Sequence, residues 1–147
     1  MLITLNVGGA LIPLAVSAIM LNLLLLKPQA LKVLLAVMLN IAVVTFSSYA
    51  FSRVVPGVGV VLPALLPPLT SALTSFIATL CLGVSRYMLP VAYIGAVTGT
   101  LVGADLLNLV KNLDKLRAHV VSIGGAGVFD GVYLSGVMAL TLALLMG

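Results

Sequence analysis

Charged side chains are scarce in this chain. Only 7% of its 147 residues are charged, whereas 63% are hydrophobic. An ordinary soluble domain carries about 25% charged residues, so this composition excludes a protein that covers itself with a polar surface. We therefore predict a multi-pass protein of the cell membrane, whose main partner is membrane lipid.

Residue types that bind metals and cofactors are also few. The single cysteine, Cys81, excludes an intrachain disulfide, and the single histidine, His119, leaves no His/Cys cluster for zinc. The GGAG stretch at 124–127 belongs to no nucleotide-binding GxxxxGK[ST] or GxGxxG pattern. We therefore expect neither a metal nor a cofactor. The net charge of +4 comes from basic residues in or beside short loops, where they anchor to lipid headgroups, so no nucleic-acid partner is expected.

Long apolar runs, by contrast, fill most of the sequence. A bilayer core about 30 Å thick needs roughly 20 residues for each helical crossing, and backbone groups in lipid must be paired internally, which favours helices. We predict an all-α fold, a polytopic transmembrane helix bundle in one domain over residues 1–147. Its five segments lie near 2–26, 30–51, 58–82, 88–110 and 120–146. Glycine and proline interrupt some of them, and the proline-rich segment 58–82 is consistent with either a full crossing or a re-entrant path.

Small residues recur at four-residue spacing on the last two segments. A helix face without side chains lets another helix approach closely. We therefore expect close packing at Gly95, Gly99 and Gly103. A second small-residue stripe starts at Gly127 and continues through Gly131, so Gly131 is expected at a helix contact as well.

Two of the three acidic residues, Asp105 and Asp130, lie inside apolar segments. A carboxylate at the centre of a membrane helix costs about 3 kcal/mol, so such residues indicate a functional site. A loop of about nine residues joins the two segments, which makes them antiparallel neighbours and brings the carboxyl groups within reach of each other. Two such groups without a cation share a proton, which is the state that an aspartyl hydrolase needs.

Other polar and glycine residues are expected to line the same site. At 100° per residue, Thr98 and Asn108 share the helix face of Asp105. The broken helix starts contribute exposed amide groups, which can hold an anion or a developing oxyanion. The expected lining residues there are Asn6, Ser122, Gly124, Gly125 and Gly127.

Four stretches of the chain resemble an uncharacterised family of prokaryotic polytopic membrane proteins, a domain of unknown function. They are LNVGGALIP, the stretch from PGVG to LPALLPPL, GTLVGADLLNL and SIGGAGVFDG, and the resemblance covers nearly the whole chain. The resemblance implies a family and supplies no reaction.

A second resemblance is to the GxGD-type intramembrane aspartyl proteases, the presenilin and signal-peptide-peptidase group. It implies that Asp105 matches the first catalytic aspartate and Asp130 the second, with Gly125 and Gly127 as the motif glycines. Two residues, at 128–129, intervene between glycine and aspartate here. The Pro-Ala-Leu element of that group follows its second aspartate, whereas Pro63 to Leu65 precedes both aspartates in this chain.

Three functions are consistent with these residues. The first is an intramembrane aspartyl hydrolase that acts on a transmembrane peptide. The second is a small ion- or proton-coupled transporter or channel for an ion or solute, which predicts one cavity lined by Asn6, Asn40 and Asp130. The third is a structural subunit of a homo-oligomer or larger membrane complex, in which the aspartates hold helices together.

Overall fold

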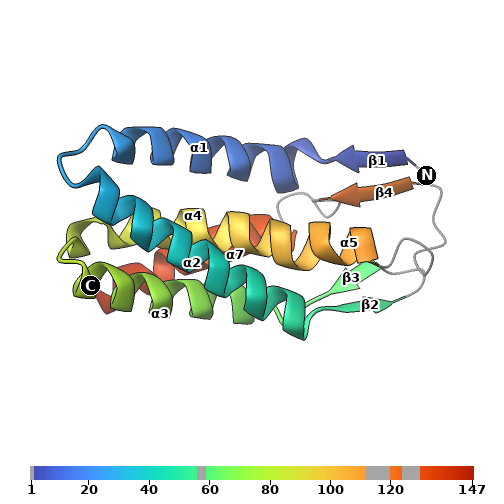
Figure 1. The fold of residues 1–147 in the computed structure, drawn as a ribbon. Coiled ribbons are helices and arrows are strands. Elements are labelled where there is room, and N and C mark those ends of the chain that lie inside the picture. The colour runs from blue at the N-terminus through green and yellow to red at the C-terminus, as the bar shows by residue number, and fades with distance from the viewer. Residues whose placement is uncertain (1, 56–58, 112–119, 124–129) are drawn as a thin grey trace.

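The structure, a computed structural model, describes residues 2–55, 59–111, 120–123 and 130–147. Most of these residues are helical, which confirms the predicted all-α fold. Successive long helices run in alternating directions (Figure 1). The described helices are the π-helix η1 (Val7–Leu11), α1 (Ile12–Leu25), α2 (Ala30–Phe51), α3 (Leu66–Cys81), the 3-10 helix η2 (Ser85–Tyr87), α4 (Met88–Thr100), the π-helix η3 (Leu101–Leu106), α5 (Leu107–Lys111) and α7 (Gly131–Met146).

Three helical stretches in the described part of the chain are long and apolar enough to cross a membrane. They are Val7–Leu25, Ala30–Phe51 and Ser85–Lys111. On the first two, large hydrophobic side chains such as Ile19 and Phe46 are exposed. Apolar surface of this extent is suited to contact with lipid, so the structure supports a membrane protein.

The other two long helices begin later than the apolar runs that contain them. Both α3 and α7 have 16 residues, which is about 24 Å of helix and less than the hydrocarbon thickness of about 30 Å. Extended backbone occupies part of each run instead. Pro67 and Pro68 lie in the first turn of α3, where a missing N–H costs nothing, so these prolines start a helix and do not break one.

Short strands, which the sequence did not predict, form two pairs at one end of the bundle (Figure 1). In the first pair, β1 (Leu2–Leu5) runs parallel to β4 (Val120–Ile123). In the second, β2 (Arg53–Val55) and β3 (Gly59–Val61) form an antiparallel hairpin. The parallel pair places the start of the first apolar segment beside the start of the last.

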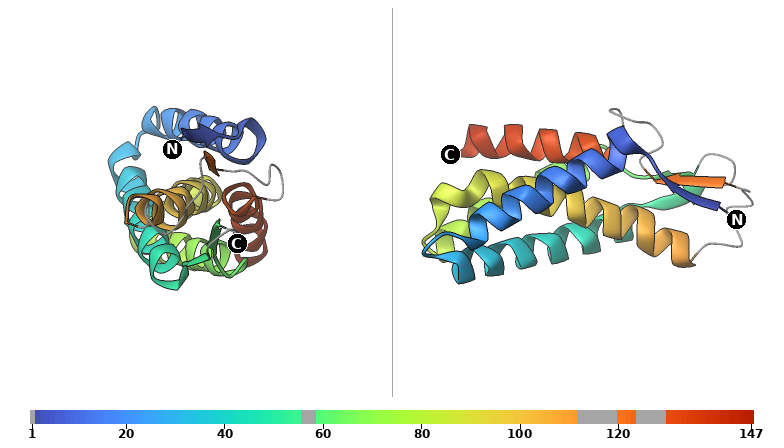
Figure 2. Two further views of the ribbon diagram at one scale, coloured as in Figure 1. Left: turned by 90° about the vertical axis from the view of Figure 1, so that its right-hand side faces the viewer. Right: turned by 90° about the horizontal axis from the view of Figure 1, so that it is seen from above.

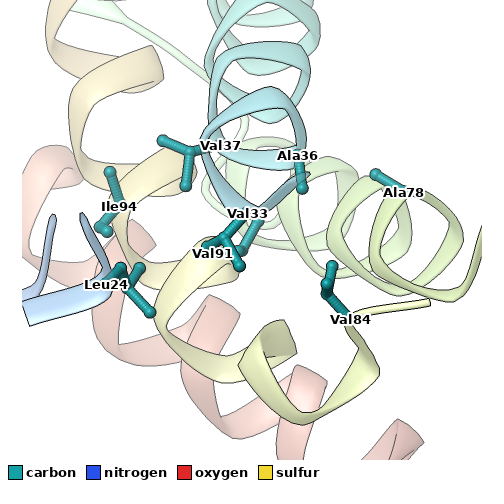
Figure 3. Packing of buried hydrophobic residues seen from close by; sticks show 8 residues of the cluster. All are labelled: Leu24, Val33, Ala36, Val37, Ala78, Val84, Val91 and Ile94. Carbon is teal, nitrogen blue, oxygen red and sulfur yellow. The ribbon is translucent and has the colours of Figure 1, made fainter. Parts of the chain in front are cut away.

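Helix α4 lies at the centre of the bundle. It contacts α1, α2, α3 and α7, which surround it (Figure 2). All residues at positions 91–97 are buried. One hydrophobic cluster joins α4 to three of these neighbours, as Figure 3 shows. Its members are Leu24, Val33, Ala36, Val37, Ala78, Val84, Val91 and Ile94.

Three glycines at four-residue spacing lie on the side of α4 that faces α2. We call Gly95, Gly99 and Gly103 the glycine face; the last of them lies in η3, which continues α4. A Cβ atom added at any of the three would come closer than 3.0 Å to α2, where it would meet Asn40, Val44 and Thr45 in that order. The glycine face therefore brings the two backbones to a distance that no other residue allows.

On α7 the close approach lies at a different glycine from the expected one. A Cβ atom at Gly131 would meet nothing within 4 Å, because Gly131 is the exposed first residue of the helix. At Gly136 the same atom would lie 2.6 Å from Cγ2 of Val97 on α4. Gly136 is therefore a glycine at which α7 approaches α4 closely.

These contacts predict opposite effects for one substitution at two sites. Gly99→Ala should destabilise the protein by about 1–3 kcal/mol, because the new methyl group overlaps Val44 in a packed interface. Gly131→Ala should be neutral or stabilising by up to about 1 kcal/mol, because its methyl group enters open space and alanine favours the helix. Unfolding of both variants in detergent measures the difference, and equal stability would contradict the packing described here.

Candidate functional site

A pocket of about 310 Å³ lies at the end of the bundle that carries the strand pairs. It is formed where β3 and the segment after it meet the start of α3, the end of α4, η3 and the start of α7. Both Asp105 and Asp130 line it. The lining residues in the described part of the chain are 60–64, Pro67, Thr100, Ala104, Asp105, 130–132 and Leu134.

Asp130 reaches the pocket as the N-cap of α7. Its backbone is extended, and its Oδ2 accepts a hydrogen bond of 2.9 Å from the N–H of Val132. Aspartate is a preferred N-cap because its carboxylate pairs a helix N–H that has no partner within the helix. The partial positive charge at the helix start also stabilises a negative charge there. Capping therefore fixes this carboxyl group at the pocket.

Asp105 reaches the pocket from η3, the π-helix that follows α4, whereas Asp130 reaches it from the start of α7. The side chain of Asp105 is half-buried and lines the same pocket as Asp130. None of the described lining residues is basic. The pocket therefore combines two acidic groups with largely apolar walls.

The segment after β3 forms one of these walls. Pro63 and Ala64 line the pocket beside the two aspartates, and Pro67 places the first turn of α3 there. Both α3 and α7 thus begin at the pocket. Residues 60–64 were not predicted from the sequence as part of the site, although Pro63 and Ala64 begin the Pro-Ala-Leu element, which was a signal for it.

Thr98 and Asn108, which the helical wheel places beside Asp105, are absent from the described pocket lining. Asn108 is buried on the α2 side, where its Nδ2 lies 2.6 Å from Oγ of Ser52. The wheel fails because residues 101–106 form a π-helix, which holds one more residue per turn than an α-helix. The direction of every later side chain changes as a result.

Two of the residues predicted at the broken helix starts, Asn6 and Ser122, are described by the structure. Asn6 caps η1, where its Oδ1 accepts hydrogen bonds from the N–H groups of Gly8 and Gly9, and it is not among the described lining residues. The backbone of Ser122 pairs with Thr4 in the parallel strand pair. The three expected glycines lie outside the described residues: Gly124, Gly125 and Gly127.

A buried hydroxyl pair joins the two helices that carry the aspartates. Oγ1 of Thr100 donates to Oγ of Ser135 at 3.2 Å, and both residues are almost fully buried. Thr100 lies five residues before Asp105, and Ser135 lies five residues after Asp130. This hydrogen bond therefore ties α4 to α7 close to both carboxyl groups, and Thr100 is a pocket residue that the sequence analysis missed.

The family model described as "Protein of unknown function (DUF1614)" matches residues 1–142. The chain therefore belongs to this family. No curated protein and no solved structure matches the chain.

The hydroxyl pair predicts a measurable coupling between two substitutions. In a double-mutant cycle, Thr100→Val and Ser135→Ala should show a coupling free energy of about 0.6 kcal/mol, the average for hydrogen bonds between membrane helices. Thr141→Val is the matched control, because this exposed threonine donates to the Val137 carbonyl of its own helix. A coupling of zero for the first pair would show that the hydroxyls do not tie the helices together.

Proposed function

We propose that this DUF1614 protein is an intramembrane aspartyl hydrolase, a multi-pass protein of the cell membrane that cleaves a peptide bond of a transmembrane segment. Asp105 and Asp130 are the catalytic pair. The observation that carries the proposal is their position in a single pocket with largely apolar walls. Two carboxyl groups that share such a site favour a state in which one proton serves both groups.

That state supplies both an acid and a base. The ionised carboxylate removes a proton from a water molecule, whose oxygen attacks the carbonyl carbon of the peptide. The protonated carboxyl group donates its proton to the carbonyl oxygen. The resulting diol collapses as the C–N bond breaks, and the leaving amine takes the proton that the base had removed. One hydroxyl group of the diol returns its proton to the other carboxylate, which leaves a carboxylic acid as the second product. One water molecule is consumed for each bond, and the pair returns to its shared-proton state.

The walls of the pocket support a peptide substrate of low polarity. Residues 60–62, Pro63 and Ala64 give the pocket an apolar side next to the aspartates. Two aspartates and a Pro-Ala-Leu element are also the elements that mark the GxGD-type proteases, which this chain resembles. In sequence Pro63 is far from Asp105 and Asp130, yet all three line one pocket.

Ion- or proton-coupled transport is the second function with a specific observation in its favour. Both α3 and α7 begin at the pocket, and helices that start within a membrane protein form the ion and substrate sites of many transporters. The cavity that transport predicts would also include Asn6 and Asn40. Asn40 is instead bonded to the carbonyl groups of Ser71 and Val91 between three helices.

The hydrolase proposal predicts loss of cleavage with retention of the fold. Asp105→Asn and Asp130→Asn keep the size of each side chain but remove its titratable proton, so each should lower the cleavage rate by at least about 100-fold. Asp114→Asn is the matched control, since it makes the same change at the remaining acidic residue. The measurement is cleavage of a panel of transmembrane peptides by purified protein in liposomes, with thermal stability of each variant alongside.

The alternatives give different results in the same preparation. A protein that cleaves no peptide but carries an ion flux that both aspartate variants abolish is a transporter. If the parent protein shows neither cleavage nor flux, and the variants are as stable as the parent or more so, the aspartates have a structural role.

A further inference from the structure

We propose that Asn108 is a positioning residue, which holds η3 in its π-helical form and thereby directs Asp105 into the pocket. The proposal extends the proposed function, because it names a residue outside the pocket that the catalytic pair depends on. Two observations support it. The side chain of Asn108 bonds to the backbone of η3, and Asp105 lines the pocket whereas Asn108 does not.

The π-helix leaves one carbonyl group without its regular donor. The N–H of Leu107 bonds to the carbonyl of Val102, five residues back. In an α-helix the same N–H would bond to Gly103, four residues back. A carbonyl group that loses its helical partner in a buried place needs another donor.

Asn108 supplies a donor at this position. Its Nδ2 lies 3.3 Å from the carbonyl oxygen of Gly103 and 2.9 Å from that of Ala104. The side chain is only 5% exposed, so water cannot readily take its place. The amide group of Asn108 therefore stabilises the form of the helix that has the extra residue.

The same amide group ties η3 to α2. Its Nδ2 also contacts Oγ of Ser52 at 2.6 Å, and Ser52 is the C-cap of α2. Ser52 is fixed in turn, because its hydroxyl donates to the carbonyl oxygen of Tyr49 at 2.9 Å. On this side Gly103 has no side chain and its backbone touches α2 at Thr45. Asn108 thus anchors the π-helix at the point of closest approach.

The position of the extra residue decides where Asp105 points. If η3 relaxed to an α-helix, the side chains at its end, Asp105 among them, would turn relative to α4 by up to one residue position, about 100°. Asp105 would then leave the part of the pocket that it shares with Thr100 of α4. Asn108 therefore acts on catalysis through Asp105 without touching the substrate.

The test compares two buried asparagines. Asn108→Leu removes the donor at nearly constant size and should lower kcat by on the order of 100-fold with little change in KM, as expected when a catalytic group is misdirected. Asn40→Leu is the matched control, because Asn40 also bridges helices but bonds to the carbonyl groups of Ser71 on α3 and Val91 on α4, outside η3. It should lower stability and leave kcat of the folded protein near that of the parent. Ser52→Ala removes one acceptor of the Asn108 amide group and leaves the carbonyl groups of Gly103 and Ala104. It should therefore give a smaller loss of kcat than Asn108→Leu.

A second measurement does not depend on hydrolysis. In a Cys81→Ala background, Asp105→Cys and Asp130→Cys together should be joined by a short thiol-specific cross-linker. Addition of Asn108→Leu should abolish the cross-link, and addition of Asn40→Leu should leave it. Retention of the cross-link with Asn108→Leu overturns the positioning role. Loss of the cross-link in a protein that cleaves no peptide supports the positioning role and counts against the hydrolase.

Discussion

The close contact between α4 and α2 is the constraint on which the rest of the structure depends. Because the glycine face has no side chains, the backbone of α4 touches α2 directly, and Val44 fills the space at Gly99. In a bilayer, helices gain little from burying apolar side chains away from lipid, so such backbone contact is a main source of association. With one side of α4 held in this way, its other sides remain for α1, α3 and α7.

The pocket lies at the end of the bundle where α3 and α7 begin. Both α3 and α7 are shorter than a bilayer core, and both start at the pocket. Non-helical backbone at membrane depth is tolerated where protein surrounds it or where it lines a cavity. β3 pairs with β2, and the cap of α7 is made by Asp130 itself. A polar site can therefore exist beside apolar helices without leaving helix ends unpaired.

Two buried hydrogen-bond groups bracket the π-helix that carries Asp105. Before it, Thr100 bonds to Ser135 and fixes α4 against α7. After it, Asn108 bonds to the backbone of η3 and to the end of α2. A π-turn is less favourable than an α-turn and often marks a functional site. These contacts give a physical reason why it persists here and why Asp105 lies at the pocket.

The membrane-like helical class could be predicted from the sequence, because apolar content and run length are properties of local sequence. The sequence also indicated Asp105 and Asp130, since acidic residues stand out in apolar segments. That Pro63 lines the same pocket could be learned only from the fold, because the pocket joins distant parts of the chain. The fold also decided that Asn108 faces α2 and not the pocket. A helical wheel assumes one constant angle per residue, whereas the π-turn in η3 depends on contacts that α2 makes with it.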